Sequence, residues 1–174
     1  AEHLKKNAGK ALVVCGINDV NIQMVFNEIN KMNGAFGNTM TIDKNVHSKQ
    51  RQGSDSDLNA LLDDMKNGSV NALIVCDGAN PAYDIPGKAD EFAKSLSKVA
   101  LSVSLSLSLD ETASLCKFVA PDHHHLESWG DAEPKSGEVY VIQPTIAPLF
   151  DSRHAGESLL KWAGINNSYQ NFMM

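Results

Sequence analysis

Short apolar runs alternate with amphipathic stretches along the first part of the chain. Residues 10–16 (Lys-Ala-Leu-Val-Val-Cys-Gly) and 70–76 are largely apolar, which is typical of strands buried on both faces of a parallel sheet. Apolar and polar spacing predicts a further short strand at residues 39–42, and helices at residues 20–32, 57–66 and 88–98. This alternation predicts an α/β fold with an open, mostly parallel, Rossmann-like sheet and helices on both of its faces.

Residues 101–109 (Leu-Ser-Val-Ser-Leu-Ser-Leu-Ser-Leu) alternate strictly between apolar residues and serine. A period of two predicts a strand with one apolar face and one face that carries only serine. Two interpretations remain open for the serine face. It is either a hydroxyl-lined surface that faces a ligand or partner, or a close-packed face where small side chains let a helix approach.

The second half of the chain has weaker patterns. A short helix is predicted after Asp110, whose carboxylate suits a helix N-terminus. Beyond Pro121 we expect an irregular C-terminal extension that contains a strand at residues 138–143 and a helix at residues 156–163. We therefore expect one α/β domain over residues 1–164, excised from a larger chain, followed by a tail or linker at residues 165–174. An exposed loop is predicted at residues 45–56.

Charge and cysteine content exclude several classes of protein. The 174 residues include 15 Lys and Arg against 21 Asp and Glu, a net charge of −6 that argues against nucleic-acid binding. No apolar run approaches the roughly 18 residues of a membrane span, so direct membrane insertion is not expected. The cysteines, at positions 15, 76 and 116, are too scattered for an iron–sulfur cluster or a structural zinc site.

Two segments could carry chemistry. The turn at residues 77–81 (Asp-Gly-Ala-Asn-Pro) follows a predicted parallel strand, where α/β sheets bind ligands. Its Gly78 could approach a phosphate and its Asn80 could read a nucleotide edge, although a plain strand-to-helix turn explains the same residues. The histidines His123, His124 and His125 suggest a metal site together with Glu127 or Asp131. A solvated or packed loop is the alternative, because consecutive side chains point in opposite directions.

Four motifs resemble one protein family. Residues 80–86 match N-P-x-Y-x-x-P, residues 110–113 match D-E-T-A, residues 126–131 match L-E-S-W-G-D and residues 143–149 match Q-P-x-I-x-P-L. Together they resemble the molybdopterin-oxidoreductase-like, iron–sulfur-binding subunit of alternative complex III, which is similar to the dimethyl sulfoxide reductase superfamily.

The resemblance implies a vestigial cofactor site. In catalytic members of the superfamily, segments similar to these contact a molybdopterin guanine dinucleotide. The matching positions here are Gly78, Asn80, Pro81, Glu111 and Thr112. The N-x-E-G-R segment that follows in catalytic members is missing, and residues 131–138 are acidic instead. Acidic side chains would repel a pyrophosphate, which agrees with the loss of molybdopterin that the resemblance implies.

The expected function follows from this resemblance. We expect a cofactor-free structural or interaction domain in a respiratory, quinol-oxidising electron-transfer complex, without catalysis of its own. Its partners would be the iron–sulfur half of the same parent chain and other subunits at the periplasmic face of the inner membrane. Trp129 and Asp131 are candidate interaction residues. Two alternatives remain: a molybdopterin- or guanine-nucleotide-binding fragment of an active oxidoreductase, and a metal-binding module that uses His123 to His125.

Overall fold

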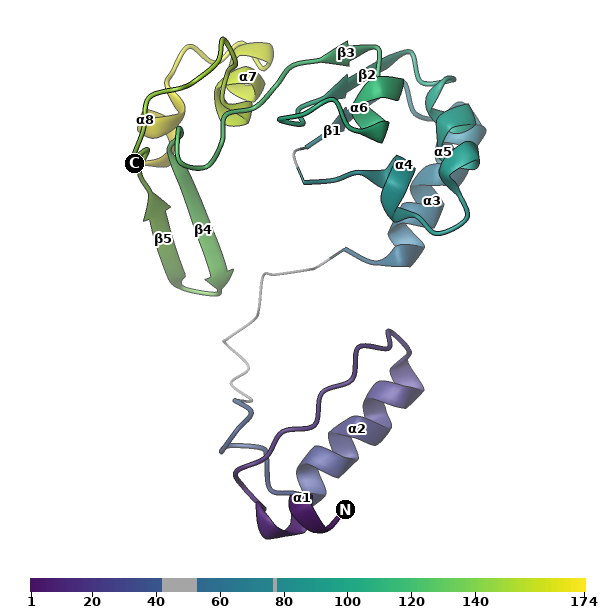
Figure 1. The fold of residues 1–174 in the computed structure, drawn as a ribbon, viewed down its shortest axis with the longest axis vertical. Coiled ribbons are helices and arrows are strands. Elements are labelled where there is room, and N and C mark those ends of the chain that lie inside the picture. Colours follow the sequence, from purple (N-terminus) through teal and green to yellow (C-terminus); the bar gives the residue numbers. More distant parts are fainter. Residues whose placement is uncertain (42–52, 77) are drawn as a thin grey trace. The chain divides into compact units, whose positions relative to one another are not determined.

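The computed structural model describes residues 1–41, 53–76 and 78–174, and the chain divides into two compact units (Figure 1). Unit 1 contains residues 1–48 with 135–137, and unit 2 contains residues 49–134 with 138–174. Asp77, Ile42 and most of the predicted loop at residues 45–56 lie outside the described residues. The division into one domain and a tail at residue 164 stays a prediction.

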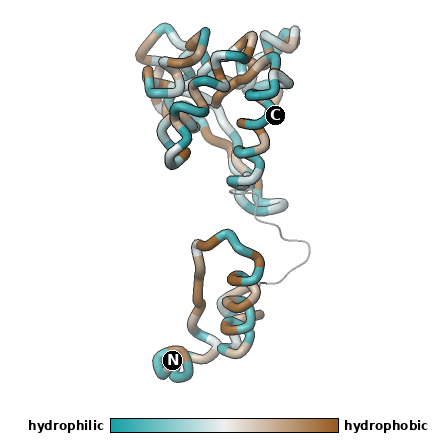
Figure 2. The backbone as a smooth tube through the Cα atoms, turned by 90° about the vertical axis from the view of Figure 1, so that its right-hand side faces the viewer, coloured by the Kyte–Doolittle hydropathy of each residue, from teal (hydrophilic) through white to brown (hydrophobic). Residues whose placement is uncertain are grey.

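Unit 1 contains the helices α1 (Glu2–Lys6) and α2 (Val20–Met32). The helix predicted over residues 20–32 is confirmed, and Asp19 caps it by accepting a hydrogen bond from the Ile22 N–H at 3.0 Å. Apolar side chains remain exposed on α2, among them Val20 and Met24, and Figure 2 shows further apolar residues along the extended segment of this unit.

The strand predicted at residues 10–16 is wrong: this segment is extended but forms no sheet among the described residues. Amide side chains of α2 take the place of a neighbouring strand. The Asn30 amide accepts from the Val13 N–H at 2.9 Å and donates to the Val13 carbonyl at 2.8 Å, and Gln23 donates to the Cys15 carbonyl at 3.1 Å. The strand predicted at residues 39–42 is also absent from its described part, where Met40 forms only an isolated bridge with Phe36.

Unit 2 is built on a small parallel sheet of the strands β1 (Ala72–Val75), β2 (Leu101–Ser104) and β3 (Phe118–Val119), in that order. Ala72 pairs with Leu101, and Val103 pairs with Phe118. The helix α3 (Asp55–Lys66) precedes β1, the helices α4 (Pro81–Asp84) and α5 (Ala89–Leu96) connect β1 to β2, and α6 (Glu111–Leu115) connects β2 to β3. The described sheet is therefore smaller than the extended Rossmann-like sheet expected from the sequence.

The core of unit 2 lies between α3, α5 and one face of the sheet. Phe92 and Leu96 of α5 pack against Leu62 and Met65 of α3 and against Leu73 of β1. The opposite face carries side chains from alternate positions, and most of them are exposed: Ala72, Ile74, Leu101 and Phe118. Within the described part of unit 2, α3 and α5 form the core on one face, and helices on both faces of the sheet stay a prediction.

The strand predicted at residues 101–109 ends at Ser104, and the first three residues of its serine face are turned toward the core, whereas Ser108 is exposed. Ser102, Ser104 and Ser106 are buried, and their hydroxyls are hydrogen-bonded within the unit. The Ser102 hydroxyl accepts from the Lys117 N–H at 2.9 Å, and the Ser106 hydroxyl donates to Asp110 at 2.8 Å. The structure thus supports the close-packed interpretation of this face, in which small side chains allow close approach.

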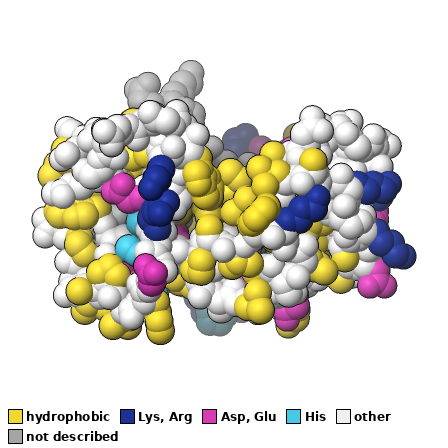
Figure 3. Space-filling model, turned by 90° about the horizontal axis from the view of Figure 1, so that it is seen from above, with side chains coloured by type: hydrophobic (Ala, Val, Ile, Leu, Met, Phe, Trp, Pro, Cys, Tyr) yellow, Lys and Arg dark blue, Asp and Glu magenta, His cyan; other side chains and the backbone are white. Residues whose placement is uncertain are grey.

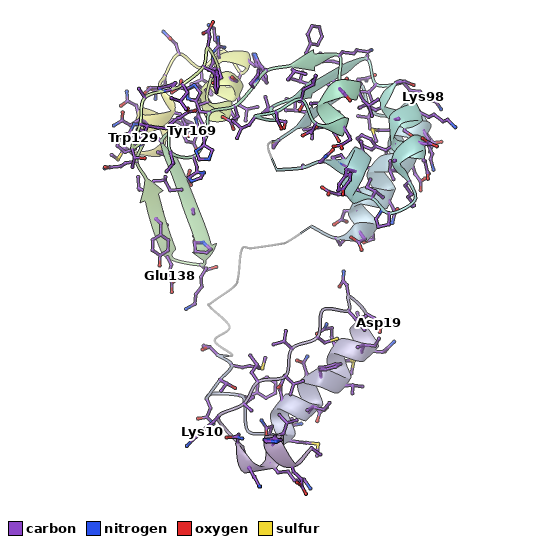
Figure 4. All side chains as sticks on the ribbon, in the orientation of Figure 1. Lys10, Asp19, Lys98, Trp129, Glu138 and Tyr169 are labelled. Atoms are coloured by element: carbon purple, nitrogen blue, oxygen red, sulfur yellow. The ribbon has the colours of Figure 1, made fainter. Side chains whose placement is uncertain are left out.

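The C-terminal part contains a hairpin and two short helices: β4 (Gly130–Lys135), β5 (Glu138–Ile142), α7 (Ala155–Trp162) and α8 (Tyr169–Met173). The predicted strand and helix are confirmed as β5 and α7. The hairpin turn uses Gly137 at a φ of 82°, a left-handed conformation that glycine adopts readily. Tyr169 lies at the base of the hairpin, where its hydroxyl donates to Asp131 at 2.8 Å (Figure 4). No described helix has the length and apolar character needed to cross a membrane.

Candidate functional site

The carboxyl ends of β1 and β2 bring two of the four sequence motifs together. The Asn80 side chain donates to Glu111 Oε2 at 2.7 Å, and its Oδ1 accepts from the Thr112 hydroxyl at 2.7 Å and from the Thr112 N–H at 3.2 Å. The Thr112 hydroxyl in turn accepts from the Ala82 N–H at 2.9 Å. We call this set of Asn80, Ala82, Glu111 and Thr112 the Asn80 clamp.

The Asn80 clamp is partly buried and well fixed. Thr112 is 0% exposed, and Asp110 caps the start of α6 by accepting from the Ala113 N–H at 2.7 Å. The hydrogen bond from Asn80 is the main reason that the pKa of the Glu111 carboxyl lies below its usual value, so the carboxylate form is favoured. The amide oxygen of Asn80 is thus already used within the fold, where the sequence suggested that it could read a nucleotide.

The backbone N–H groups of this turn are also engaged. The N–H of Ala79 donates to the Cys76 carbonyl, and the N–H of Asn80 donates to the Asp84 carboxylate at 3.3 Å. Those of Tyr83 and Asp84 donate to the Asn80 carbonyl. An anion-binding turn needs N–H groups that point at its ligand. Here the N–H groups of Ala79, Asn80, Tyr83 and Asp84 have internal acceptors, and the carboxylates of Asp84 and Glu111 lie beside the turn.

The other two predicted cofactor residues have simple local roles. Gly78 has a φ of 81°, and a Cβ added there would meet nothing within 4 Å. Pro81 is the first residue of α4, a position where its missing N–H does not interrupt the helix. The structure therefore places all five predicted residues in one region, with three of them joined by hydrogen bonds. Their role toward a cofactor stays a prediction.

The remaining two motifs meet at Glu127. This carboxylate is 8% exposed, and it accepts from the His124 N–H at 2.9 Å and from the Leu149 N–H at 3.0 Å. The Leu126 carbonyl next to it accepts from the Thr145 N–H at 2.7 Å. The segments at residues 126–131 and 143–149 are thus tied together through Glu127, which the sequence had suggested only as a metal ligand.

The Glu127 contact predicts a pH dependence of stability. Hydrogen bonds from the Leu149 and His124 N–H groups lower the pKa of the Glu127 carboxyl in the folded state. Its stabilising contribution is therefore complete above the unfolded pKa of about 4.3, and it is lost as the pH falls through the folded pKa. We expect Glu127→Gln to lower the urea midpoint at pH 7 and to flatten its decline in acid.

Urea titrations at a series of pH values measure this effect. The matched control is Asp64→Asn, which changes an exposed carboxylate on α3 to an amide and should leave the profile unchanged. A Glu127→Gln protein whose profile coincides with that of the original chain at every pH would contradict the assignment.

The three histidines do not form a metal centre in the described residues. No three His, Cys, Asp or Glu side chains in that part of the chain are arranged to hold a metal ion. The rings of His124 and His125 lie 4.0 Å apart, and the Nε2 atom of His123 is buried without a hydrogen-bond partner. Of the two candidate interaction residues, Trp129 is half-buried, and Asp131 is held by Tyr169.

A cavity of about 360 Å³ opens at the carboxyl end of the sheet. Its wall includes Cys76, Leu107 and Asp122, which follow β1, β2 and β3. Ligands of α/β sheets commonly bind beyond the carboxyl ends of the strands. His154 also lines it, and burial lowers the pKa of this imidazole, which favours the neutral ring. Sequence reasoning missed Leu107 and His154. Leu107 lies inside the strand predicted at residues 101–109, whereas β2 ends at Ser104, so the sequence did not place Leu107 at the end of a strand; nothing in the sequence pointed to His154 either.

Comparisons with known proteins relate part of this chain to subunits of reductases. No family model matches the chain. A stretch of 90 residues, 49% of the chain, is 38% identical to the menaquinone reductase, molybdopterin-binding-like subunit, of Nitratidesulfovibrio vulgaris. A stretch of 62 residues, 34% of the chain, is 34% identical to a tetrathionate reductase subunit of Salmonella typhimurium. These matches span 13% and 6% of the two proteins. The chain is therefore related to molybdopterin-oxidoreductase-type reductase subunits and corresponds to a small part of their length.

Proposed function

We propose that this chain is a structural and docking segment of a subunit in a quinone-linked respiratory complex, similar to the iron–sulfur-binding subunit of alternative complex III. In this proposal it holds no molybdopterin and performs no catalysis, and the iron–sulfur clusters lie elsewhere in the parent chain. The relation to a molybdopterin-binding-like subunit of a menaquinone reductase supports both the quinone link and the kind of subunit.

The observation that carries the proposal is the internal use of the expected cofactor turn. The Asn80 oxygen is occupied by Thr112, and the N–H groups of Asn80 and Ala82 have acceptors within the fold. A nucleotide or pterin would have to displace these bonds, and its phosphates would approach the carboxylates of Asp84 and Glu111. The residues that the sequence suggested as a vestigial cofactor site therefore fit a role in holding two loops together.

Partners and location follow from this proposal. The domain would contact the iron–sulfur half of its own parent chain and neighbouring subunits, in a complex at the periplasmic face of the inner membrane. The exposed apolar side chains of β5, such as Val139 and Tyr140, offer contact area for such partners. They project from an exposed strand, whereas Trp129 is half-buried and Asp131 accepts a hydrogen bond from the Tyr169 hydroxyl.

A second candidate, binding of a guanine nucleotide or pterin, is favoured by one observation. A second cavity, of about 310 Å³, is lined by Asn80 and Pro81 of the turn, and its volume lies within the range of small-molecule sites. The two candidates differ in their use of Asn80, and this difference can be measured.

Thermal unfolding with added guanine nucleotide distinguishes them. At millimolar GMP or GDP, the proposal predicts an unchanged melting temperature, because nothing binds the folded state preferentially. A rise that grows with nucleotide concentration and disappears in Asn80→Ala, but persists in the exposed control Tyr83→Ala, would overturn the proposal. Molybdenum in stoichiometric amounts in the purified parent complex, bound at this segment, would also overturn it.

A further inference from the structure

The last residues of the chain are tied to the rest of unit 2 through Tyr169. The sequence suggested only a tail or linker at residues 165–174, whereas the structure forms α8 there. The Tyr169 N–H donates to Glu157 Oε1 of α7 at 2.6 Å, and the Tyr169 hydroxyl donates to Asp131 Oδ1 of β4 at 2.8 Å. Burial and the hydrogen bond to Asp131 raise the pKa of this hydroxyl, so it is protonated at neutral pH and can donate. One residue therefore joins α8 to both α7 and β4.

The Tyr169 ring packs on the backbone of α7 at a position where that helix has no side chain. A Cβ added at Gly156 would overlap carbon atoms of the ring, so this close approach requires glycine. The His154 ring lies 4.6 Å from the Tyr169 ring, measured between ring centroids, and covers it from another side. Figure 3 shows histidine and acidic side chains close together on the left of the view, the side on which Figure 1 places α7 and α8. The shape of α7 and the hydrogen bonds together fit a tyrosine at position 169.

The strands β4 and β5 have little packing to hold them in place. Every residue of β5 is exposed, and no residue of β4 is more than half-buried. A two-stranded hairpin is only marginally stable by itself in water. The direction of these strands therefore depends on how they are tied to the rest of unit 2. Asp131, the second residue of β4, carries the tie to Tyr169.

We propose that residues 165–174 form a strap, anchored by Tyr169, that fixes the direction of β4 and β5 on the rest of unit 2. The proposal rests on the docking role given above, in which exposed side chains of β5 such as Val139 and Tyr140 offer contact area to a partner. With the strap closed, these side chains are held in one direction before a partner binds. With the strap open, the partner has to order them, and this ordering opposes binding. The strap thus regulates the docking surface.

Hydrogen exchange of the full chain at pH 7, followed by mass spectrometry without any ligand, tests the strap. Gly156→Ala places a methyl group where the Tyr169 ring lies, and alanine is a better helix former than glycine, so α7 itself is not weakened. We expect this variant to raise amide exchange in β4, β5 and α8 about tenfold or more. Tyr169→Phe, which removes only the hydroxyl, should raise it about threefold. The matched control Phe172→Ala, at an exposed residue of α8, should leave exchange in β4 and β5 unchanged.

An internal reference separates the strap from a general effect on stability. Amides of α5 and β2 lie in the core of unit 2 and should exchange at the same rate in all of these proteins. Faster exchange in this reference to the same extent as in β4 and β5 overturns the proposal, because Tyr169 then contributes only to global stability. Faster exchange confined to residues 165–174 also overturns it, because the strap then does not hold the strands. Neither result depends on nucleotide binding, so the strap and the proposed function can fail separately.

Discussion

Replacing Phe92 with alanine is expected to lower the free energy of unfolding of unit 2 by about 3–5 kcal/mol. Phe92 is 1% exposed and lies at the centre of the core, where it contacts residues of α3 and β1. Truncation removes the buried ring and leaves a cavity that the helices can only partly close. Because small domains have total stabilities of about 5–15 kcal/mol, this loss is a large fraction of the whole.

Urea unfolding followed by circular dichroism measures this loss. The matched control is Tyr83→Ala, which removes an aromatic ring that is 73% exposed on α4 and should change the free energy of unfolding by less than about 0.5 kcal/mol. Similar effects of the two substitutions would show that the core does not lie where the structure places it. Tyr83 also belongs to the N-P-x-Y-x-x-P motif. The change in the free energy of unfolding of Tyr83→Ala therefore also shows whether the tyrosine of this motif contributes to stability.

Replacing Thr112 with valine is expected to cost about 1–3 kcal/mol of folding free energy, the second largest effect. Valine has nearly the same shape but cannot accept the hydrogen bond from the Ala82 N–H or donate one to the Asn80 oxygen. Ala82 is itself buried, so its N–H would lose its acceptor without gaining water. The loss therefore comes from an unsatisfied polar group and needs no change in packing.

Thr112→Ser is the matched control, since it keeps the hydroxyl and removes only a methyl group. We expect serine to retain more stability than valine at this position, in the same urea assay. A valine protein that is as stable as the original chain, or more stable than the serine protein, would contradict the role of the hydroxyl in the Asn80 clamp.

Local signals predicted the helices better than the strands. Residues 20–32 combine apolar spacing with the capping residue Asp19, and α2 has these bounds. Residues 57–66 were predicted to start at Asp57, but α3 begins two residues earlier, because Ser54 is the cap and Asp57 completes the capping box. Both residue types are good caps, so the sequence alone could not choose between them.

The prediction of a strand at residues 10–16 was wrong for a different reason. Its apolar composition is that of a buried strand, and the backbone is extended as such a composition favours. The hydrogen bonds, however, go to Gln23 and Asn30 of α2. Side-chain amides that pair with a backbone segment leave no periodic trace in the sequence, and so they could not be anticipated.

The two segments that form the Asn80 clamp were predicted from the sequence, but the hydrogen bonds between them were not. Both the turn after the strand at residues 70–76 and the helix start at Asp110 were identified from local residues. The contacts within the Asn80 clamp join residues that lie about thirty positions apart, and spacing along the chain carries no information on which side chain meets which. Glu127 was missed as a structural residue because its hydrogen-bond donors are backbone N–H groups.

The central claim is that the Asn80 clamp holds the fold together, and a double-mutant cycle of Asn80→Ala and Thr112→Val tests it most directly. Both side chains take part in the same hydrogen bonds, so the loss in the double variant should be smaller than the sum of the two single losses. We expect a coupling free energy of about 1 kcal/mol or more from urea unfolding in the absence of any ligand. Losses that add to within about 0.3 kcal/mol would contradict the claim.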